Sequence, residues 1–254
     1  MKSIGNDITE RLIETGKLKP GMRVLDLGCG NGNVSFIVSK FVGQHGIVVG
    51  LDNNKNAINA AKQKANELEL SNMKFIELDI TKNFEIEYSK FDVIIVRRVL
   101  MYLSNPIKTI RNAITHLKPN GLFLVQENDM SLVPIGLEGM PIHQKIIGLI
   151  KKTLAKENAN LNFGFELNTI LTNSGLKVEK IWAEATVSTP SQLTPWSFLA
   201  NVMKERMLKH EVIKNLSELN LDSLEERLTE ERLSNTKTFI SDIVFCGVAR
   251  KLSI

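Results

Sequence analysis

One apolar run that opens directly into three closely spaced glycines constrains this chain more than any other feature. Residues 24–27 are largely apolar and predict a buried parallel strand, and Gly28, Gly30 and Gly32 follow it. Glycine tolerates left-handed backbone conformations and carries no side chain, so the backbone of such a turn can approach a ligand closely. With a helix expected to begin near Asn33, the pattern predicts a ligand site at a strand-to-helix turn.

The spacing of these glycines argues against a dinucleotide as the ligand. A dinucleotide fingerprint has glycine at its first, third and sixth positions, but the sixth position counted from Gly28 is Asn33, and the glycine falls at Gly32. Asp26 also stands two residues before Gly28, where its negative charge would repel a diphosphate. A ligand with a cationic group is favoured, and an NAD-dependent oxidoreductase is disfavoured.

Strand-like and helix-like segments alternate through the first half of the chain, which predicts a parallel sheet with helices on both faces. Helices are expected near 8–13, 33–41 and 55–68, and buried strands over 24–27, 46–52, 75–79, 92–96 and 122–125. Two further strands are predicted over 178–187 and 239–249. The expected fold is therefore α/β, with a doubly wound, mostly parallel, seven-stranded sheet.

Three of the predicted strands close with an aspartate: Asp26, Asp52 and Asp79. In a doubly wound sheet their carboxyl ends meet beside the crevice where ligands bind, and carboxylates gathered there need a cationic or hydrogen-bond-donating partner. Asp52 follows Gly28 at close to the spacing of about 20 residues at which an acid reaches ribose hydroxyls. Each acid alone could cap a helix or end a strand, but their joint spacing favours a nucleoside site.

The segment Val-Leu-Asp-Leu-Gly-Cys-Gly-Asn-Gly, residues 24–32, resembles the first motif of the class I S-adenosylmethionine-dependent methyltransferases. The ligand of that family carries an ammonium and a sulfonium but no phosphate. The resemblance implies that Asp26 lies near the methionine end of the cofactor, Asp52 on its ribose, and Asp79 on the adenine amino group, with Ile80 against the ring.

The resemblance extends beyond this motif, to the family's small-molecule branch. It covers residues 6–130 and resumes over 164–188 and 236–251. Asn53 departs from the family, which often has an apolar residue there that packs on the adenine, so Ile80 is left to cover the ring. The complete set of predicted cofactor-binding residues is Asp26, Gly28, Gly30, Asn31, Gly32, Asp52, Asn53, Asp79, Ile80 and Arg97.

Two segments exceed what the minimal fold needs, and both are rich in helix formers. We expect one methyltransferase domain over residues 1–254, with inserted helical segments at about 131–157 and 192–235. In this branch of the family, an insertion between the last two strands tends to sit over the acceptor site. We therefore expect 192–235 to act as a lid, the alternatives being a bundle that widens the core or a dimer contact.

The residues that handle the acceptor are less constrained, because in-line methyl transfer from a sulfonium needs mainly positioning and desolvation. Glu127 is predicted to contact the acceptor as a base or counter-charge, since the fifth strand is expected to end at Val125. Arg98 and Tyr102, after the fourth strand, are expected to face the same region. Their alternatives are a surface ion pair for Arg98 and a half-buried helix position for Tyr102.

Composition further limits which partners, metal sites and cellular locations we expect. The net charge of +4 is spread along the chain, so no nucleic-acid partner is expected. Cys29 and Cys246 have no Cys-x-x-Cys partner, and the four histidines lack metal-ligand spacing, so no metal is expected; His143 is expected to face solvent. There is no amino-terminal signal-like segment and no apolar run near the ~20 residues that span a membrane, which predicts a cytoplasmic protein.

These observations together predict an S-adenosylmethionine-dependent methyltransferase that methylates nitrogen or oxygen of a small-molecule acceptor and releases S-adenosylhomocysteine. The alternatives are an RNA or protein methyltransferase, which would show salt-sensitive polymer binding, and a non-catalytic S-adenosylmethionine-binding module. The oligomeric state stays open.

Overall fold

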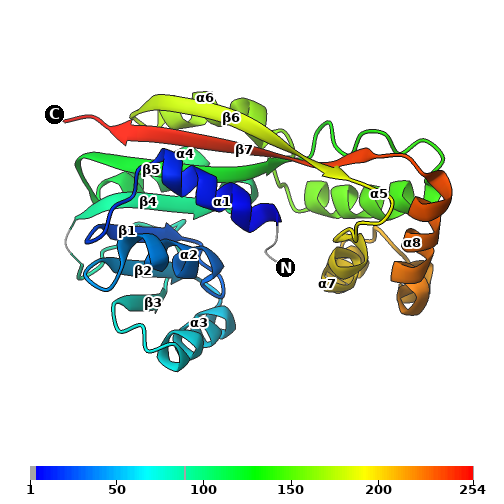
Figure 1. Cartoon of the computed structure of the whole chain (residues 1–254), viewed down its shortest axis with the longest axis horizontal. Helices are drawn as coiled ribbons and strands as arrows, with labels where there is room; N and C mark the ends of the chain where they lie inside the picture. Colours follow the sequence, from blue (N-terminus) through cyan, green and yellow to red (C-terminus); the bar gives the residue numbers. More distant parts are fainter. Residues whose placement is uncertain (1–3, 89, 254) are drawn as a thin grey trace. The chain divides into compact units, whose positions relative to one another are not determined.

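The computed structural model describes residues 4–88 and 90–253, and these form a seven-stranded sheet flanked by helices (Figure 1). The strand order is β3-β2-β1-β4-β5-β7-β6. The strands are β1 (Arg23–Leu27), β2 (Ile47–Asp52), β3 (Met73–Glu77), β4 (Phe91–Arg97), β5 (Leu117–Asp129), β6 (Leu176–Ser188) and β7 (Phe239–Lys251).

Helices connect most of the strands. They are α1 (Ile4–Thr15), α2 (Asn33–Val42), α3 (Lys55–Glu67), α4 (Pro106–Ile114), α5 (Pro141–Lys156), α6 (Phe163–Asn173), α7 (Trp196–Lys209) and α8 (Leu224–Asn235). Three short 3-10 turns are η1 (Leu100–Tyr102), η2 (Leu216–Glu218) and η3 (Leu221–Ser223). Asn54 caps α3, because its side-chain oxygen accepts hydrogen bonds from the backbone of Asn56 and Ala57.

The sheet is doubly wound about β1. Parallel ladders join β1 to β2, β2 to β3, β1 to β4, and β4 to β5, so the chain moves outward in one direction and then returns to build in the other. Because parallel crossovers are right-handed, α2 and α3 cover one face and α4 the other. The strand order reverses between β1 and β4, which places the ligand crevice at their carboxyl ends.

The last two strands complete the sheet as a hairpin. In Figure 1 the arrows of β6 and β7 point in opposite directions, and β7 lies between β5 and β6. The predicted α/β class, with a mostly parallel seven-stranded sheet, is confirmed. The central strands β1 and β4 are almost completely buried, as expected for strands covered on both faces.

Two predicted strand ends that bear on the site are wrong. β3 ends at Glu77 rather than at Asp79, because the Asp79 carboxylate accepts a hydrogen bond from the Thr81 backbone and turns the chain. β5 continues to Asp129 rather than stopping at Val125, so Glu127 lies inside the strand rather than beyond it. Of the polar residues that suggested an end to β5, Gln126, Glu127 and Asp129 are buried, and Gln126 Oε1 and Glu127 Oε1 accept hydrogen bonds from other parts of the chain.

The described chain divides into two compact units. The first unit extends up to Glu127 and includes 164–183 and the residues from Phe245 onward, and the second comprises 128–163 and 184–244. The predicted insertions at 131–157 and 192–235 both fall in the second unit. The single-domain interpretation and the lid role of 192–235 stay predictions. No helix within the described ranges is long and apolar enough to cross a membrane.

Candidate functional site

The glycine turn between β1 and α2 has the left-handed backbone that its sequence implies. Gly28, Gly30 and Gly32 have φ angles of 68°, 53° and 83°. A Cβ atom at Gly28 would lie 2.4 Å from a methyl group of Val99, so a side chain cannot be accommodated there without displacing Val99. The backbone N–H of Cys29 donates to the carbonyl of Leu51 at 2.9 Å, which ties the turn to β2. Backbone is thereby presented at the carboxyl edge of the sheet.

Asp26 supplies a buried, half-satisfied carboxylate beside this turn. Its side chain is 1% exposed, and Oδ2 accepts a hydrogen bond from the Ser35 hydroxyl at 2.5 Å. Oδ1 is buried and has no hydrogen-bond partner among the described residues. Burial raises the pKa of Asp26 to about 6, although Ser35 and the Arg97 charge oppose the rise. An unpaired buried acceptor of this kind fits a cationic group of a ligand.

Asp52, the last residue of β2, holds the turn from the other side. Its Oδ2 accepts from the backbone N–H of Gly30 at 2.8 Å, and its Oδ1 accepts from the backbone N–H of Asn54 at 2.8 Å. The carboxylate is half-buried and therefore remains accessible to further donors. Asp52 thus both shapes the glycine turn and offers an anionic acceptor beside it.

The predicted adenine-binding residues lie farther along the same edge, after β3. Ile80 is buried, with 7% of its side chain exposed. The Asp79 carboxylate accepts from the backbone and hydroxyl of Thr81 at 3.0 and 2.6 Å and pairs with Lys82 at 3.5 Å. Hydrogen bonds from Thr81 lower the pKa of Asp79, so it is ionised at neutral pH. Asn53 is exposed.

Arg97 belongs to a polar network that anchors α1 to the sheet. One of its guanidinium nitrogens, Nη1, donates to Asn6 Oδ1 at 3.1 Å and to Thr9 Oγ1 at 3.0 Å. Thr9 in turn donates to Gln126 Oε1 at 2.7 Å. Sequence reasoning missed Asn6 and Thr9; the available signal was a polar residue, Thr9, within the apolar positions of the first predicted helix.

Glu127 holds the loop that follows β4. Its side chain is fully buried, and Oε1 accepts from the backbone N–H groups of Val99 and Leu100 at 2.9 and 2.8 Å. Oε2 is buried and unpartnered within the described chain, and burial raises the pKa of Glu127 to about 7. Since Val99 packs against Gly28, Glu127 connects β5 to the glycine turn through this loop.

Arg98 begins this loop in a left-handed conformation, with φ 57°, which is uncommon for a residue other than glycine. Its side chain is exposed, and its charge favours the ionised form of Glu127. Tyr102 lies in η1 and is 47% exposed. The structure therefore brings Asp52 into contact with the glycine turn that follows the buried Asp26, whereas Asn31, Asn53, Arg98 and Tyr102 have exposed side chains.

Comparisons with known sequences agree with this site. The family described as "Methyltransferase domain" matches residues 18–186. The chain is 28% identical to the demethylmenaquinone methyltransferase of Lactococcus lactis over 137 residues, which are 54% of each protein. It is 33% identical to phosphoethanolamine N-methyltransferase 1 of Arabidopsis thaliana over 123 residues, 48% of this chain and 24% of that protein. The chain thus spans about half, or less, of the curated relatives it matches.

Solved structures share the fold at low identity. A putative methyltransferase from Bacillus halodurans has a TM-score of 0.63 at 15% identity, covering 97% of this chain and 100% of that one. Phosphoethanolamine N-methyltransferase 2 of Haemonchus contortus, in complex with S-adenosylmethionine, has a TM-score of 0.62 at 17% identity, covering 99% and 53%. The [4+2]-cyclase SpnF has a TM-score of 0.59 at 18% identity, covering 98% and 82%, so this fold is not confined to methyltransferases.

The sequence match covers well over half of the chain and includes the glycine turn and both acids that contact or flank it. The resemblance seen in residues 24–32 is confirmed, as is S-adenosylmethionine as the cofactor of the family. The chain belongs to the class I S-adenosylmethionine-dependent methyltransferases, in the family described as "Methyltransferase domain".

Proposed function

We propose that the protein transfers a methyl group from S-adenosylmethionine to a small-molecule acceptor. The observation that carries the proposal is the unpartnered, buried Oδ1 of Asp26 beside the left-handed turn at Gly28. A buried carboxylate raises the free energy of the folded protein unless a donor or cation reaches it. The ammonium of S-adenosylmethionine supplies both a positive charge and hydrogen-bond donors.

Each residue of the site then has a role in binding and orienting the cofactor. Asp26 binds the methionine ammonium, the glycine turn lies against the methionine portion, and Asp52 accepts from the ribose hydroxyls while it holds Gly30. Ile80 covers the adenine, and Asp79 accepts from its amino group. We also propose that Asn31, Asn53 and Arg97 contact the cofactor. The cofactor contributes an activated methyl on sulfonium, so the protein contributes position and exclusion of water.

The acceptor is proposed to be a small molecule methylated on nitrogen or oxygen. The small-molecule class is supported by relatives whose names specify demethylmenaquinone and phosphoethanolamine, and only the second of these names specifies the methylated atom, which is nitrogen. The acceptor roles of Glu127, Arg98 and Tyr102 stay predictions. For Glu127, a pKa near 7 suits a general base, but one of its oxygens already accepts from two backbone amides, which favours a positioning role for the loop at Val99.

Titration calorimetry with S-adenosylmethionine, S-adenosylhomocysteine and NADH tests the cofactor, and we expect binding of the first two only. Tight NADH binding with no response to either sulfur ligand would overturn the proposal. Release of S-adenosylhomocysteine in a panel of amines, phenols and acids tests turnover. Cofactor binding without turnover on any acceptor supports the non-catalytic alternative, and salt-sensitive binding of RNA supports the polymer alternative. A cytoplasmic location also stays a prediction.

A further inference from the structure

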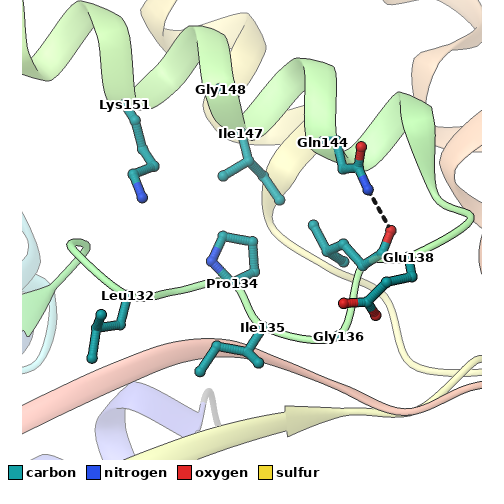
Figure 2. A pocket seen from close by; sticks show the side chains of 10 residues that line it. Leu132, Pro134, Ile135, Gly136, Glu138, Gln144, Ile147, Gly148 and Lys151 are labelled. Carbon is teal, nitrogen blue, oxygen red and sulfur yellow. Dashed lines mark hydrogen bonds between the residues drawn. The ribbon is translucent and has the colours of Figure 1, made fainter.

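The second unit contains a cavity of about 440 Å³ between α5 and the loop that precedes it (Figure 2). This volume lies within the range of about 300 to 1,000 Å³ that small-molecule sites occupy. The accessible apolar side chains of its lining are Leu132, Pro134 and Ile135, whereas Leu137 and Ile147 are buried in the core beneath it. The cavity therefore offers a small molecule an apolar wall.

The loop that forms this wall is fixed by hydrogen bonds. The backbones of Ile135 and Ile240 donate to each other's carbonyl groups at 3.0 Å, and the Gln144 side chain donates to the carbonyl of Leu137 at 2.7 Å. Despite this anchoring, the side chains of Leu132 and Ile135 are 60% and 47% exposed. A fixed backbone that presents apolar side chains is preorganised for a ligand, because little conformational entropy remains to be lost on binding.

Gly148 adds space to the cavity from the opposite side. It lies in the middle of α5, where glycine destabilises a helix by roughly 0.5 to 1 kcal/mol relative to alanine. Apart from its chain neighbours and the backbone of its own helix, no described atom lies within 4 Å of the position that a Cβ atom would occupy. Packing within the described chain therefore does not require a glycine here, and what its missing side chain leaves is room beside the cavity.

Lys151 places a positive charge at one end of the cavity. Of the described residues that line it, Lys151 is the one cation, and it lies one helical turn beyond Gly148. Its ammonium donates to the carbonyls of Val133 at 3.2 Å and Ser131 at 3.5 Å. Partial burial lowers the pKa of Lys151, and the charge of Asp129 opposes that shift. An anion at this end of the cavity would gain a charged hydrogen-bond donor.

The acidic residue of the lining lies toward the other end. Glu138 is exposed and belongs to the part of the loop near Gln144 (Figure 2). Gln144 and Lys151 are seven residues apart on α5, a separation of roughly 10 Å at 1.5 Å per residue. The cavity thus has an ammonium at one end and apolar side chains along its length, and its anionic group is remote from that ammonium.

We infer that this cavity is a binding site for a small amphipathic carboxylate, whose carboxylate lies at Lys151 and whose apolar chain lies along Pro134, Ile135 and Gly148. The inference goes beyond the proposed methyl transfer and does not depend on it, because all of these residues belong to the second unit. Charge complementarity selects an anion rather than an amine.

Titration calorimetry on the full-length protein without cofactor tests this site, with octanoate, octylamine and octanol as probes. We expect octanoate to bind at least tenfold more tightly than octylamine. Lys151→Gln removes the charge and should weaken octanoate binding at least fivefold, whereas the matched control Lys152→Gln, on the exposed neighbouring residue, should leave it unchanged.

Filling the cavity gives the second test. Gly148→Leu should abolish binding of both octanoate and octanol, and Gly148→Ala, which favours the helix, should weaken it less. Thermal unfolding of each variant checks that the fold is retained. Equal binding of octanoate and octylamine, or octanoate binding that survives both Lys151→Gln and Gly148→Leu, would overturn the inference. Failure of methyl transfer would not affect it, because these titrations contain no cofactor or acceptor.

Discussion

The two units differ in the buried ionisable side chains that leave an atom without a hydrogen-bond partner in the described chain: those of the first unit are acids and those of the second are bases. In the first unit, Asp26 and Glu127 are buried carboxylates, and each has one oxygen without a hydrogen-bond partner in the described chain. In the second unit, His143 and Arg232 are buried bases, and His143 Nε2 and Arg232 Nε likewise have no hydrogen-bond partner in the described chain. Burial disfavours the charged form of every such group, so acids and bases respond to pH with opposite signs.

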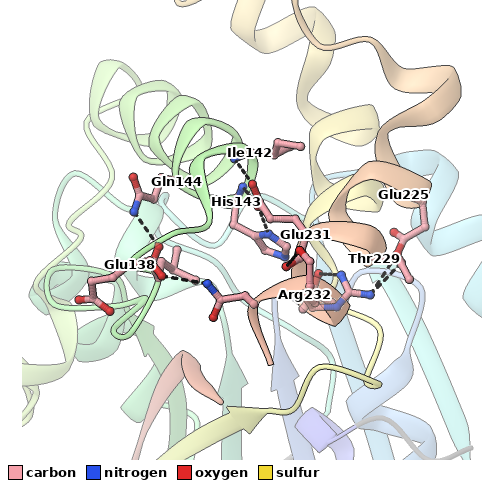
Figure 3. Close-up of polar contacts among 12 residues, drawn as sticks. Glu138, Ile142, His143, Gln144, Glu225, Thr229, Glu231 and Arg232 are labelled. Atoms are coloured by element: carbon pink, nitrogen blue, oxygen red, sulfur yellow. Dashed lines mark hydrogen bonds and ion pairs between the residues drawn. The ribbon is translucent and has the colours of Figure 1, made fainter. Parts of the chain in front are cut away.

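The bases of the second unit are largely satisfied from within it (Figure 3). The Glu231 carboxylate accepts from the backbone of Ile142 and His143 at 2.8 and 2.9 Å, and it lies 2.6 Å from His143 Nδ1. Arg232 donates to Thr194 and Thr229. The expectation that His143 faces solvent is wrong, because Glu231 on α8 draws it into the core. The unused acceptor of Asp26 differs from the unpartnered nitrogens of His143 and Arg232 in its location, because it lies beside the glycine turn, where a cationic cofactor is proposed.

Removing the Asp26 charge should have the largest effect. Asp26→Asn should weaken S-adenosylmethionine binding by about 3 kcal/mol, roughly a hundredfold, because the ammonium then lacks its buried counter-charge. The pKa of Asp26 is about 6 before binding, so wild-type affinity should fall as pH drops below 6, while the affinity of Asp26→Asn should not. Calorimetry between pH 5 and 8 measures both effects.

The exposed carboxylate Glu67 provides the control for this experiment. Glu67→Gln should bind the cofactor like the wild type at every pH. If Asp26→Asn also binds normally, Asp26 does not contact the cofactor. The unused acceptor oxygen of Asp26 then has no role in cofactor binding.

Glu127→Gln tests the cost of burying the second acid. The folded-state pKa of about 7 exceeds the ordinary value of 4.5, so the folded protein holds more protons than the unfolded one between these pH values. Its unfolding free energy should therefore fall as pH rises from 4.5 to 7, by at most about 3 kcal/mol. In Glu127→Gln this part of the slope should disappear, as urea titrations at several pH values would reveal.

The same variant separates the two roles proposed for Glu127. If Glu127 is a base for the acceptor, Glu127→Gln should bind the cofactor normally and lose at least tenfold in turnover on an identified acceptor. If it positions the loop at Val99, cofactor affinity should fall together with turnover, because Val99 packs on Gly28. Unchanged affinity and turnover would exclude both roles.

Asp52→Ala should have a somewhat smaller effect than Asp26→Asn, weakening the cofactor by roughly 1 to 3 kcal/mol. The loss combines the ribose contact with the hydrogen bond from Gly30 that holds the turn. Asp52→Asn keeps the shape and one acceptor oxygen, so it should retain more affinity. Equal affinity in the wild type and both variants, measured by calorimetry, would remove Asp52 from the site.

Sequence periodicity was sufficient for the elements whose burial is purely apolar. The predicted strands over 46–52 and 92–96 differ from β2 and β4 by no more than one residue at either end, and the predicted helix start near Asn33 agrees with α2. Sequence patterns fail where a polar residue is buried, because its partner lies elsewhere in the chain. Gln126 accepts a hydrogen bond from Thr9, and Glu127 accepts one from the backbone of Val99. A prediction that places every polar residue at the surface therefore ends β5 too early.

The inserted segments show the same limit more strongly. Their existence follows from length, since the minimal fold does not need residues 131–157 and 192–235. Their internal contacts cannot be predicted from length. The backbone N–H groups at the start of α5 donate to Glu231, which lies nearly ninety residues away in the chain. The cavity at Lys151 likewise depends on a loop conformation with left-handed glycines at Gly136 and Gly139, which no periodic pattern specifies.

The smallest effect is expected at His143, and it should have the opposite sign to that at Glu127. Burial lowers the pKa of His143 although Glu231 and Glu225 favour its charged form, with the nearby Arg232 opposing them. The folded state therefore binds fewer protons than the unfolded state, whose histidine titrates near 6.5, and stability should be lost as pH falls below that value.

Amide hydrogen exchange in α5 and α8, corrected for its intrinsic pH dependence, should be faster at pH 5 than at pH 7. His143→Gln should reduce this difference, whereas His45→Gln, at an exposed position, should not. Equal protection of α5 and α8 at both pH values would show that the second unit does not respond to acid as a buried base requires.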